Sequence, residues 1–271
     1  MKSGHVYFIG AGPGAPDLIT VRGRELITQA DLVIYADSLV HPGVAGYAKP
    51  GAEVIGSKAM TLEQTTERML AVVAVGQTVA RVQSGDPSVY GAMQEQLAVL
   101  EEHGVQYTIV PGVSSAFAAA ALLHAELTVP EVAQTVIFTR MSGRTPVPER
   151  ERLRDLAAHQ TSLVIFLSIP LIEQVVAELI AGGYAADTPA AVVYRATWDD
   201  ELVLRGTLAD IAGKAKAAKL QLQSLILVGK ALDPLLRTAN AYRSNLYHPA
   251  FTQRHRRGTA SETVVSEVVV S

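Results

Sequence analysis

The sequence predicts an α/β fold with two α/β domains, a parallel-sheet domain at the N-terminus followed by a mixed-sheet domain. Short apolar stretches alternate with segments of helical periodicity as far as residue 110. Strand, helix and strand with short connections imply right-handed βαβ units and therefore a parallel sheet. The alternation begins again near residue 128, which indicates a second domain. Residues 201–206 have the pattern of an antiparallel strand, which predicts that the second sheet is mixed.

The first predicted strand runs into a loop rich in glycine and proline. Residues 5–9 are β-formers, and residues 10–17 hold three glycines and two prolines before helical periodicity begins. The glycine spacing satisfies the loose dinucleotide fingerprint, with Asp31 and Asp37 at a distance from which an acid could reach a ribose. Pro13 argues against a dinucleotide because it has no N–H for a pyrophosphate. We interpret the loop as one that binds a less anionic small molecule; a simple turn that needs glycine is the alternative.

The remaining elements of the first half keep the same alternation. Strands are predicted at 31–37, 53–55, 78–82 and 106–110, and helices at 63–75, 93–103 and 117–124, with Thr61 as the cap of the first of these helices. Two further loops, Gln83–Gly91 and Val110–Ala116, follow strands. Ligands of parallel sheets bind beyond the carboxyl ends of the strands, so we expect the three loops to converge on one ligand. Asp86, Ser114 and Ser115 either contact that ligand or cap the segments that follow them.

The second half carries its own set of elements. Strands are predicted at 134–140, 163–167, 191–194, 201–206 and 224–228, and helices at 153–159, 171–181 and 208–218. Residues 142–150 are too rich in proline and glycine for regular structure, and charged loops of this kind commonly carry function. We place the N-terminal domain at 1–112, the C-terminal domain at 113–235, and a polar extension at 236–271 whose end we expect to be mobile.

The composition excludes several classes of protein. The 271 residues include no cysteine, so disulfides, thiolate catalysis and Cys-ligated zinc are excluded, and the seven histidines lack paired spacing, so we expect no metal site. A net charge of −3 without a basic stripe argues against a nucleic-acid partner. No apolar run reaches the ~18 residues of a membrane span, and the start lacks a signal-peptide pattern. We expect no membrane partner and a cytoplasmic location.

Three signatures in this order carry a resemblance to a known family. They are Gly10-Ala11-Gly12-Pro13-Gly14, Gly85-Asp86-Pro87 and Val110-Pro111-Gly112-Val113-Ser114-Ser115-Ala116. From Val6 to about Tyr247 the chain resembles the tetrapyrrole methylases, S-adenosylmethionine-dependent enzymes built from two α/β domains. Four further stretches resemble the subgroup that methylates C-11 of precorrin-4 or cobalt-precorrin-4 in cobalamin biosynthesis. These stretches are Tyr35–Val40, Gly143–Glu149, Tyr194–Trp198 and Tyr242–Tyr247.

The resemblance implies where the ligands bind. S-adenosylmethionine, which leaves as S-adenosylhomocysteine, would sit tightly folded in the trough between the domains, and the active site would lie there. The residues implied in cofactor binding are Pro13, Ser84, Gly85, Asp86, Ser115, Ala116, Leu167, Ala196 and Ser224. Leu167 stands where relatives commonly have methionine. The resemblance also implies a homodimer and a small-molecule tetrapyrrole substrate, and it leaves open whether that substrate contains cobalt.

Methyl transfer from a sulfonium is an in-line displacement, so alignment carries much of the rate and no covalent nucleophile is needed. A carboxylate near the pyrrole nitrogen would stabilise developing positive charge or accept a proton. We predict Asp37 as this catalytic carboxylate, with Asp86 as the competitor, and a turn cap as the alternative role of Asp37. The acceptor carries many carboxylates, and guanidinium binds carboxylate bidentately. We predict Arg144 as the main contact, ahead of the other candidates Arg140, Arg195 and Arg81.

Two alternative functions remain at this point. One is another methyltransferase of the same class with a different acceptor, such as uroporphyrinogen or another precorrin. The other is a nicotinamide-dependent oxidoreductase, which the first loop alone would suggest.

Overall fold

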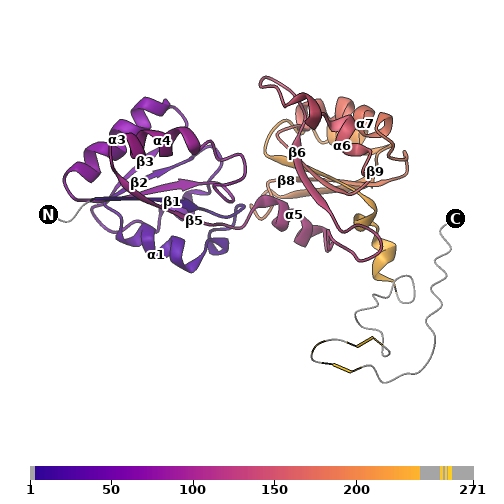
Figure 1. Cartoon of the computed structure of the whole chain (residues 1–271), viewed down its shortest axis with the longest axis horizontal. Coiled ribbons are helices and arrows are strands. Elements are labelled where there is room, and N and C mark those ends of the chain that lie inside the picture. The colour runs from indigo at the N-terminus through magenta and orange to yellow at the C-terminus, as the bar shows by residue number, and fades with distance from the viewer. Residues whose placement is uncertain (1–3, 239–250, 253, 255, 258–271) are drawn as a thin grey trace.

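The structure, a computed structural model, describes residues 4–238, 251–252, 254 and 256–257 of the chain. Two α/β units lie side by side, each formed by one five-stranded sheet covered by helices (Figure 1). This architecture confirms the predicted fold class. The stretch 242–247 used in the resemblance and most of the predicted extension lie outside the described residues.

The N-terminal sheet is parallel throughout, with strand order β3-β2-β4-β1-β5. Its strands are β1 His5–Gly10, β2 Leu32–Tyr35, β3 Glu53–Gly56, β4 Thr78–Gln83 and β5 Gln106–Val110. Its helices are α1 Val21–Gln29, α2 Pro42–Ala45, α3 Leu62–Ala74 and α4 Gln94–Glu102, with a 3-10 turn at Pro16–Leu18. Parallel pairing sends every strand's carboxyl end to one edge, so the loops that follow β1, β4 and β5 meet there.

Local sequence explains why these elements begin where they do. Thr61 caps α3 as predicted: its hydroxyl accepts from the Gln64 N–H at 3.3 Å, and the Gln64 side chain accepts from the Thr61 N–H at 3.0 Å. Alternating strand residues face opposite layers, so Phe8 packs on the side of α3 and α4, whereas Ile9 packs on the side of α1. The core of this domain therefore lies on both faces of its sheet.

The C-terminal sheet is mixed, with strand order β6-β7-β10-β8-β9. Its strands are β6 Val136–Arg140, β7 Ser162–Phe166, β8 Pro189–Tyr194, β9 Leu202–Thr207 and β10 Ser224–Val228. The β6 and β7 strands pair in parallel, whereas β10 pairs antiparallel with both β7 and β8, and β8 pairs antiparallel with β9. This pattern confirms the predicted mixed sheet and the antiparallel strand near residue 201.

Helices cover both faces of the second sheet as well. They are α5 Ser115–Leu123, α6 Leu153–Ala157, α7 Ile172–Ala181 and α8 Ile211–Ala217, with short 3-10 turns at Glu149–Glu151, Ile169–Leu171, Lys230–Leu232 and Pro234–Arg237. The small residues of α5 pack on one face, and α6, α7 and α8 cover the other. By its packing α5 belongs with the second sheet; the exact boundary after residue 112 stays a prediction. Within the described part of the chain, no helix is long and apolar enough to cross a membrane.

Candidate functional site

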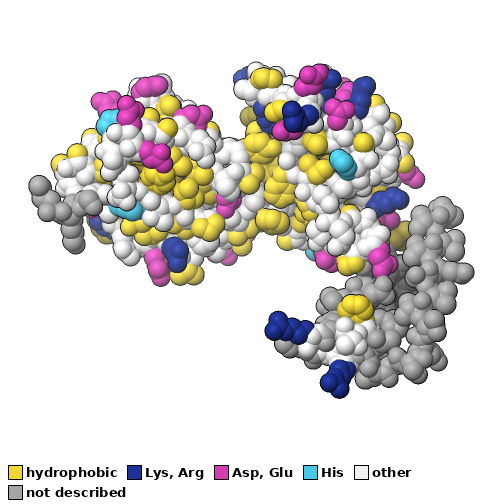
Figure 2. Space-filling model, viewed as in Figure 1, with side chains coloured by type: hydrophobic (Ala, Val, Ile, Leu, Met, Phe, Trp, Pro, Cys, Tyr) yellow, Lys and Arg dark blue, Asp and Glu magenta, His cyan; other side chains and the backbone are white. Residues whose placement is uncertain are grey.

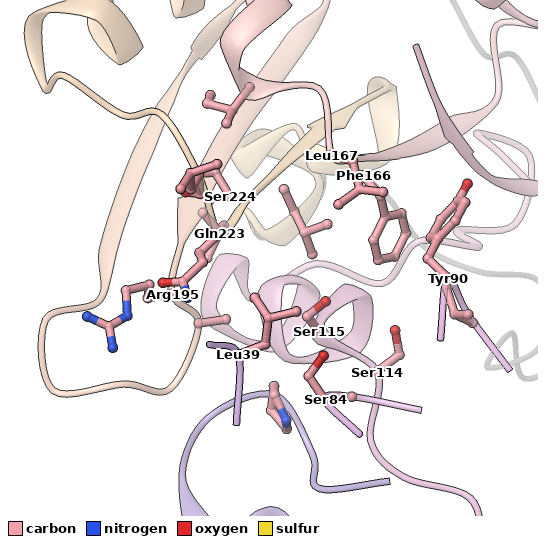
Figure 3. Close-up of a pocket in the computed structure, with 18 of the residues that line it drawn as sticks. Leu39, Ser84, Tyr90, Ser114, Ser115, Phe166, Leu167, Arg195, Gln223 and Ser224 are labelled. Atoms are coloured by element: carbon pink, nitrogen blue, oxygen red, sulfur yellow. The ribbon is translucent and has the colours of Figure 1, made fainter. Parts of the chain in front are cut away.

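A cavity of about 460 Å³ lies at the junction of the two units, with walls from both. The three predicted loops form its N-terminal side, and the segments after β7, around β8 and before β10 form the opposite side (Figure 3). Its size is that of a small-molecule site. We call it the interdomain cavity.

The three loops contact one another through backbone. Gly12 and Gly85 exchange two hydrogen bonds, of 3.2 and 2.8 Å, across an isolated antiparallel bridge. Gly85 has φ of +60°, which favours glycine, and a Cβ at Gly112 would lie 2.1 Å from the Gly85 carbonyl oxygen. The glycines thus let three strand ends approach closely enough to form one wall, as predicted from the loop sequences.

Asp86 fastens the second loop to the third. Its Oδ2 accepts from the Gly112 N–H at 2.9 Å, and its Oδ1 accepts from the N–H of Ser88 at 2.9 Å and from the Ser88 hydroxyl. Burial acts to raise the pKa of Asp86, but the hydrogen bonds from Ser88 and Gly112 outweigh it and lower the pKa below its ordinary value. Asp86 therefore caps a turn and not the predicted helix. It also lines the cavity, and its contact with a ligand stays a prediction.

The serines of the loops divide into two kinds. Ser114 caps α5 by accepting from the Ala116 N–H at 3.3 Å. Ser84 and Ser115 also line the cavity, and within the described residues neither hydroxyl has a hydrogen-bond partner (Figure 3). These two hydroxyls are therefore available to a ligand.

Three non-glycine residues of the opposite wall have positive backbone φ angles. Leu167, Arg195 and Gln223 line the cavity with φ of 54°, 45° and 51°, a region that non-glycine residues rarely adopt. Leu167 keeps 70% of its surface exposed, although it follows a fully buried strand. Such strain concentrates where a fold holds a binding surface in a fixed shape. Leu167 lies just beyond β7, whereas the sequence analysis assigned it to that strand.

Contacts between the two units close one end of the cavity. The Thr197 hydroxyl accepts from the Ala15 N–H at 2.9 Å, and the Trp198 indole N–H donates to the Pro13 carbonyl at 3.2 Å. The Gln223 side-chain amide donates to the Ser38 carbonyl at 2.7 Å. The Trp198 ring also packs on His41, with ring centres 5.0 Å apart. The segment after β8 is thereby attached to the first loop.

The structure brings most of the predicted cofactor residues together. Eight of the nine line the cavity: Pro13, Ser84, Gly85, Asp86, Ser115, Leu167, Ala196 and Ser224. Ala116 is fully buried beneath this surface in α5. Cofactor contact by these residues stays a prediction.

The predicted catalytic residues are placed differently. Asp37 is not among the residues that line the cavity; its Oδ1 accepts from the Lys58 N–H at 2.8 Å and its Oδ2 lies 3.2 Å from the Lys58 ammonium. Burial acts to raise the pKa of Asp37, and the hydrogen bonds from Lys58 overcome it, so the pKa is lowered. Arg144 is exposed and has no partner among the described residues. Their predicted roles in turnover stay predictions.

The other arginine candidates already have partners. Arg81 is 8% exposed and binds Gln96 at 3.0 Å inside the N-terminal domain, where burial lowers its pKa to about 10. Arg140 donates to backbone carbonyls of the loop that follows β6. Arg195 lines the cavity, but its guanidinium pairs with Asp200 at 2.5 Å and lies 4.0 Å from the Trp198 ring centre. Arg81 therefore lies away from the cavity, contrary to expectation.

Sequence reasoning missed several residues that line the cavity, namely Tyr90, Phe166, Trp198 and Gln223. The sequence offered a signal for Trp198, which is the single tryptophan and follows a strand at its carboxyl end. Gln223 precedes a strand, and only the antiparallel direction of β10 brings it to the same edge. The described residues contain no group of His, Cys, Asp or Glu arranged to hold a metal ion.

Comparisons with known proteins agree with this geometry. The family model of Tetrapyrrole (Corrin/Porphyrin) Methylases matches residues 5–212. A cobalt-precorrin-4 C(11)-methyltransferase of Methanocaldococcus jannaschii is 50% identical over 252 residues, covering 93% of this chain and 96% of the relative.

Two solved structures share the fold. One is a cobalt precorrin-4 methyltransferase described as a cobalamin biosynthetic enzyme, with a TM-score of 0.83 and 50% identity over 85% of this chain and 96% of the other. The second is a uroporphyrin-III C-methyltransferase from Thermus thermophilus complexed with S-adenosylhomocysteine, with a TM-score of 0.69 and 27% identity over 85% of this chain and 94% of the other. The chain belongs to the tetrapyrrole (corrin/porphyrin) methylases.

Proposed function

We propose that this protein transfers the methyl group of S-adenosylmethionine to C-11 of precorrin-4 or cobalt-precorrin-4. The observation that carries the proposal is the interdomain cavity, which gathers three loops and a strained opposite wall in a chain 50% identical to a cobalt-precorrin-4 C(11)-methyltransferase. The structural relative with bound S-adenosylhomocysteine supports the choice of cofactor.

The residues present fit such a cofactor. A molecule with an amino acid end, a ribose and an adenine needs polar groups on one side and apolar surface on the other. The free hydroxyls of Ser84 and Ser115 and the carboxylate of Asp86 supply the first, and Leu167 and Ala196 supply the second. In the proposed binding mode, Pro13 and Gly85 line the cofactor site on its N-terminal side, and Ser224 lines it on its C-terminal side. When bound, S-adenosylmethionine would supply a methyl group on a positively charged sulfur, which would take the electron pair of the methyl–sulfur bond and leave as the neutral thioether of S-adenosylhomocysteine.

The protein's own residues contribute by aligning the methyl group with the acceptor carbon. The backbone contacts among the three loops and the hydrogen bonds between the units hold the walls at a fixed separation, which favours one geometry of approach over others. In the proposed reaction the ring carbon forms the new C–C bond as the methyl–sulfur bond breaks, and a carboxylate balances positive charge on the ring. Asp37 is the proposed carboxylate and Asp86 its competitor.

The direct test uses the purified protein with either acceptor and S-adenosylmethionine carrying a labelled methyl group. We expect a labelled product whose NMR spectrum locates the methyl at C-11. Comparison of the cobalt-containing with the cobalt-free acceptor identifies the preferred substrate. A methyl at another ring position, or transfer only to uroporphyrinogen, would assign the protein to another acceptor of the same class.

A second experiment separates the cofactor from the nicotinamide alternative. S-adenosylhomocysteine at 100 times its Kd should stabilise the protein by about 2.7 kcal/mol, whereas NAD should not. We also propose a homodimer in the cytoplasm, for which light scattering on the purified protein would measure the mass.

A further inference from the structure

One end of the interdomain cavity is aromatic. The Tyr90 ring, from the N-terminal domain, packs on Phe166 of β7 with ring centres 5.1 Å apart, and Phe166 packs on Phe138 of β6 at 5.7 Å. Tyr90 remains 45% exposed and has φ of 55°, so its ring is held at the rim and not in the core. In Figure 3, Tyr90 and Phe166 lie on the opposite side of the cavity from Arg195.

The loop after β6, residues 141–148, is folded by Arg140. The guanidinium donates to the carbonyls of Thr145 at 2.9 Å and Pro146 at 2.8 Å, with a longer contact of 3.4 Å to Met141. The Gly143 N–H donates to the Thr145 carbonyl at 3.2 Å, which makes Arg144 the apex of the turn. The proline and glycine content of the loop prevents regular secondary structure. Hydrogen bonds from Arg140 hold the loop in one conformation instead.

A buried serine connects this loop to the cavity wall. The Ser168 hydroxyl accepts from the Met141 N–H at 2.8 Å and donates to the Phe166 carbonyl at 2.7 Å, and Ser168 is fully buried. The loop therefore starts from a fixed point beside Phe166. Figure 1 shows the segment between β6 and α6 projecting toward the N-terminal domain.

Arginines outnumber acidic residues four to two between positions 140 and 152. Within the described residues, Arg140 donates to carbonyls and pairs with no carboxylate, and Arg144 has no partner. The acidic residues nearby are Glu149, which pairs with Arg152, and Glu151. Burial raises the pKa of the Tyr90 hydroxyl, the charge of Arg140 acts to lower it, and the charge of Glu151 acts to raise it. Figure 2 shows Lys and Arg side chains over this part of the C-terminal domain, with Asp and Glu side chains among them.

We propose that residues 141–148 form an anion-binding lip over the aromatic end of the cavity, where the macrocycle of the acceptor lies against Tyr90 and Phe166. Arg144 at the apex binds carboxylate side arms of the acceptor, and Arg140 is the positioning residue that holds the lip in shape. The proposal rests on the proposed function, because it requires an acceptor that is both flat and rich in carboxylates. Guanidinium suits carboxylate, and aromatic rings suit a flat conjugated ligand.

The test measures binding of uroporphyrin, a stable polycarboxylate macrocycle, to the full-length protein saturated with S-adenosylhomocysteine. We expect Arg144→Gln to weaken uroporphyrin binding roughly threefold to tenfold, the range for one partly exposed charge-assisted contact. Arg140→Lys keeps the charge but cannot hold several carbonyls, so we expect a similar loss together with faster amide exchange over 141–147. Arg154→Gln is the matched control, since Arg154 pairs with Glu178 at 2.9 Å on the outer helices.

Two readouts separate the lip from a general structural effect. The Kd of S-adenosylhomocysteine should not change in either variant, and the salt dependence of uroporphyrin binding should become shallower in Arg144→Gln. If both variants bind uroporphyrin as tightly as Arg154→Gln does, the lip is refuted, whether or not the protein methylates precorrin-4. If the variants lose uroporphyrin binding selectively but no precorrin is methylated, the lip stands and the proposed function fails.

Discussion

Gly14 lies where the two domains touch, and one added methyl group there perturbs the site. A Cβ at Gly14 would lie 2.3 Å from Cδ1 of Trp198 and 2.7 Å from the Ala196 carbonyl oxygen. Both approaches are too short, so in Gly14→Ala the segment that holds Ala196 and Trp198 must move away from the first loop. That movement stretches the hydrogen bonds from Ala15 to Thr197 and from Trp198 to Pro13.

Gly14→Ala should weaken ligand binding more than it lowers the free energy of unfolding. Without ligand, the displaced segment relieves most of the clash, because its hydrogen bonds to the first loop can lengthen. If Ala196 contacts the cofactor as proposed, ligand binding needs Ala196 back at the cavity wall and therefore restores the strain. Overpacking costs about 1–3 kcal/mol, and a loss of about 2 kcal/mol corresponds to a roughly 30-fold weaker Kd. Titration calorimetry with S-adenosylhomocysteine measures it.

The chain offers a matched control for this substitution. Gly213 lies inside α8, and a Cβ there would meet nothing within 4 Å. Gly213→Ala should leave the Kd unchanged and raise stability by about 0.5–1 kcal/mol through helix propensity. A Kd for Gly14→Ala within about twofold of the Gly213→Ala value would refute the reasoning that the domain contact sets the shape of the cavity.

Three further changes test separate parts of the argument. Asp37→Asn should lower kcat about 100-fold with the Kd of S-adenosylhomocysteine unchanged if Asp37 is the proposed carboxylate; a near-normal kcat would remove it from the mechanism. Thr61→Ala removes the capping box of α3 and should cost about 1 kcal/mol in urea unfolding without affecting ligand binding, and an unchanged midpoint would contradict the role of the cap. The pKa of Asp86 is lowered in the folded state, so its ionised form stabilises the fold above the ordinary value of about 3.9, and that stability is lost as the pH falls through the folded pKa. The stability difference between wild type and Asp86→Asn should therefore stay constant from about pH 7 to pH 5 and shrink below about pH 4; a difference that persists in acid would show that the charge is not its source.

The sequence predicted what depends on local pattern. Alternation of strand and helix implies the parallel sheet, and a parallel sheet brings the ends of its strands to one edge, so convergence of the three loops followed without any tertiary information. The helix cap at Thr61 could also be predicted, because it depends only on residues that are neighbours in the sequence. The mixed second sheet was predicted from the pattern of residues 201–206, and β9 does pair antiparallel with β8.

The remaining features depend on contacts between segments far apart in the chain. Nothing around Arg81 distinguishes a buried guanidinium that binds Gln96 from one that faces a ligand. The same holds for Arg140, whose partners are backbone carbonyls that any sequence would offer once the loop had closed. The sequence shows which charged groups are present. Packing decides which of their hydrogen-bond donors are already occupied by other protein groups and which can reach a ligand.

The two sides of the cavity are stabilised by different means, and this difference bears on how the site works. On the N-terminal side, backbone bridges between glycines and the three hydrogen bonds to Asp86 fix the loops within one domain. On the C-terminal side, Leu167, Arg195 and Gln223 hold strained backbone conformations, two of them in segments that also contact the other domain. Strain of about 1–3 kcal/mol per residue persists only where surrounding contacts maintain it. Weakening the hydrogen bonds between the domains should therefore relax the C-terminal side of the cavity first, while the three loops on the N-terminal side keep their shape.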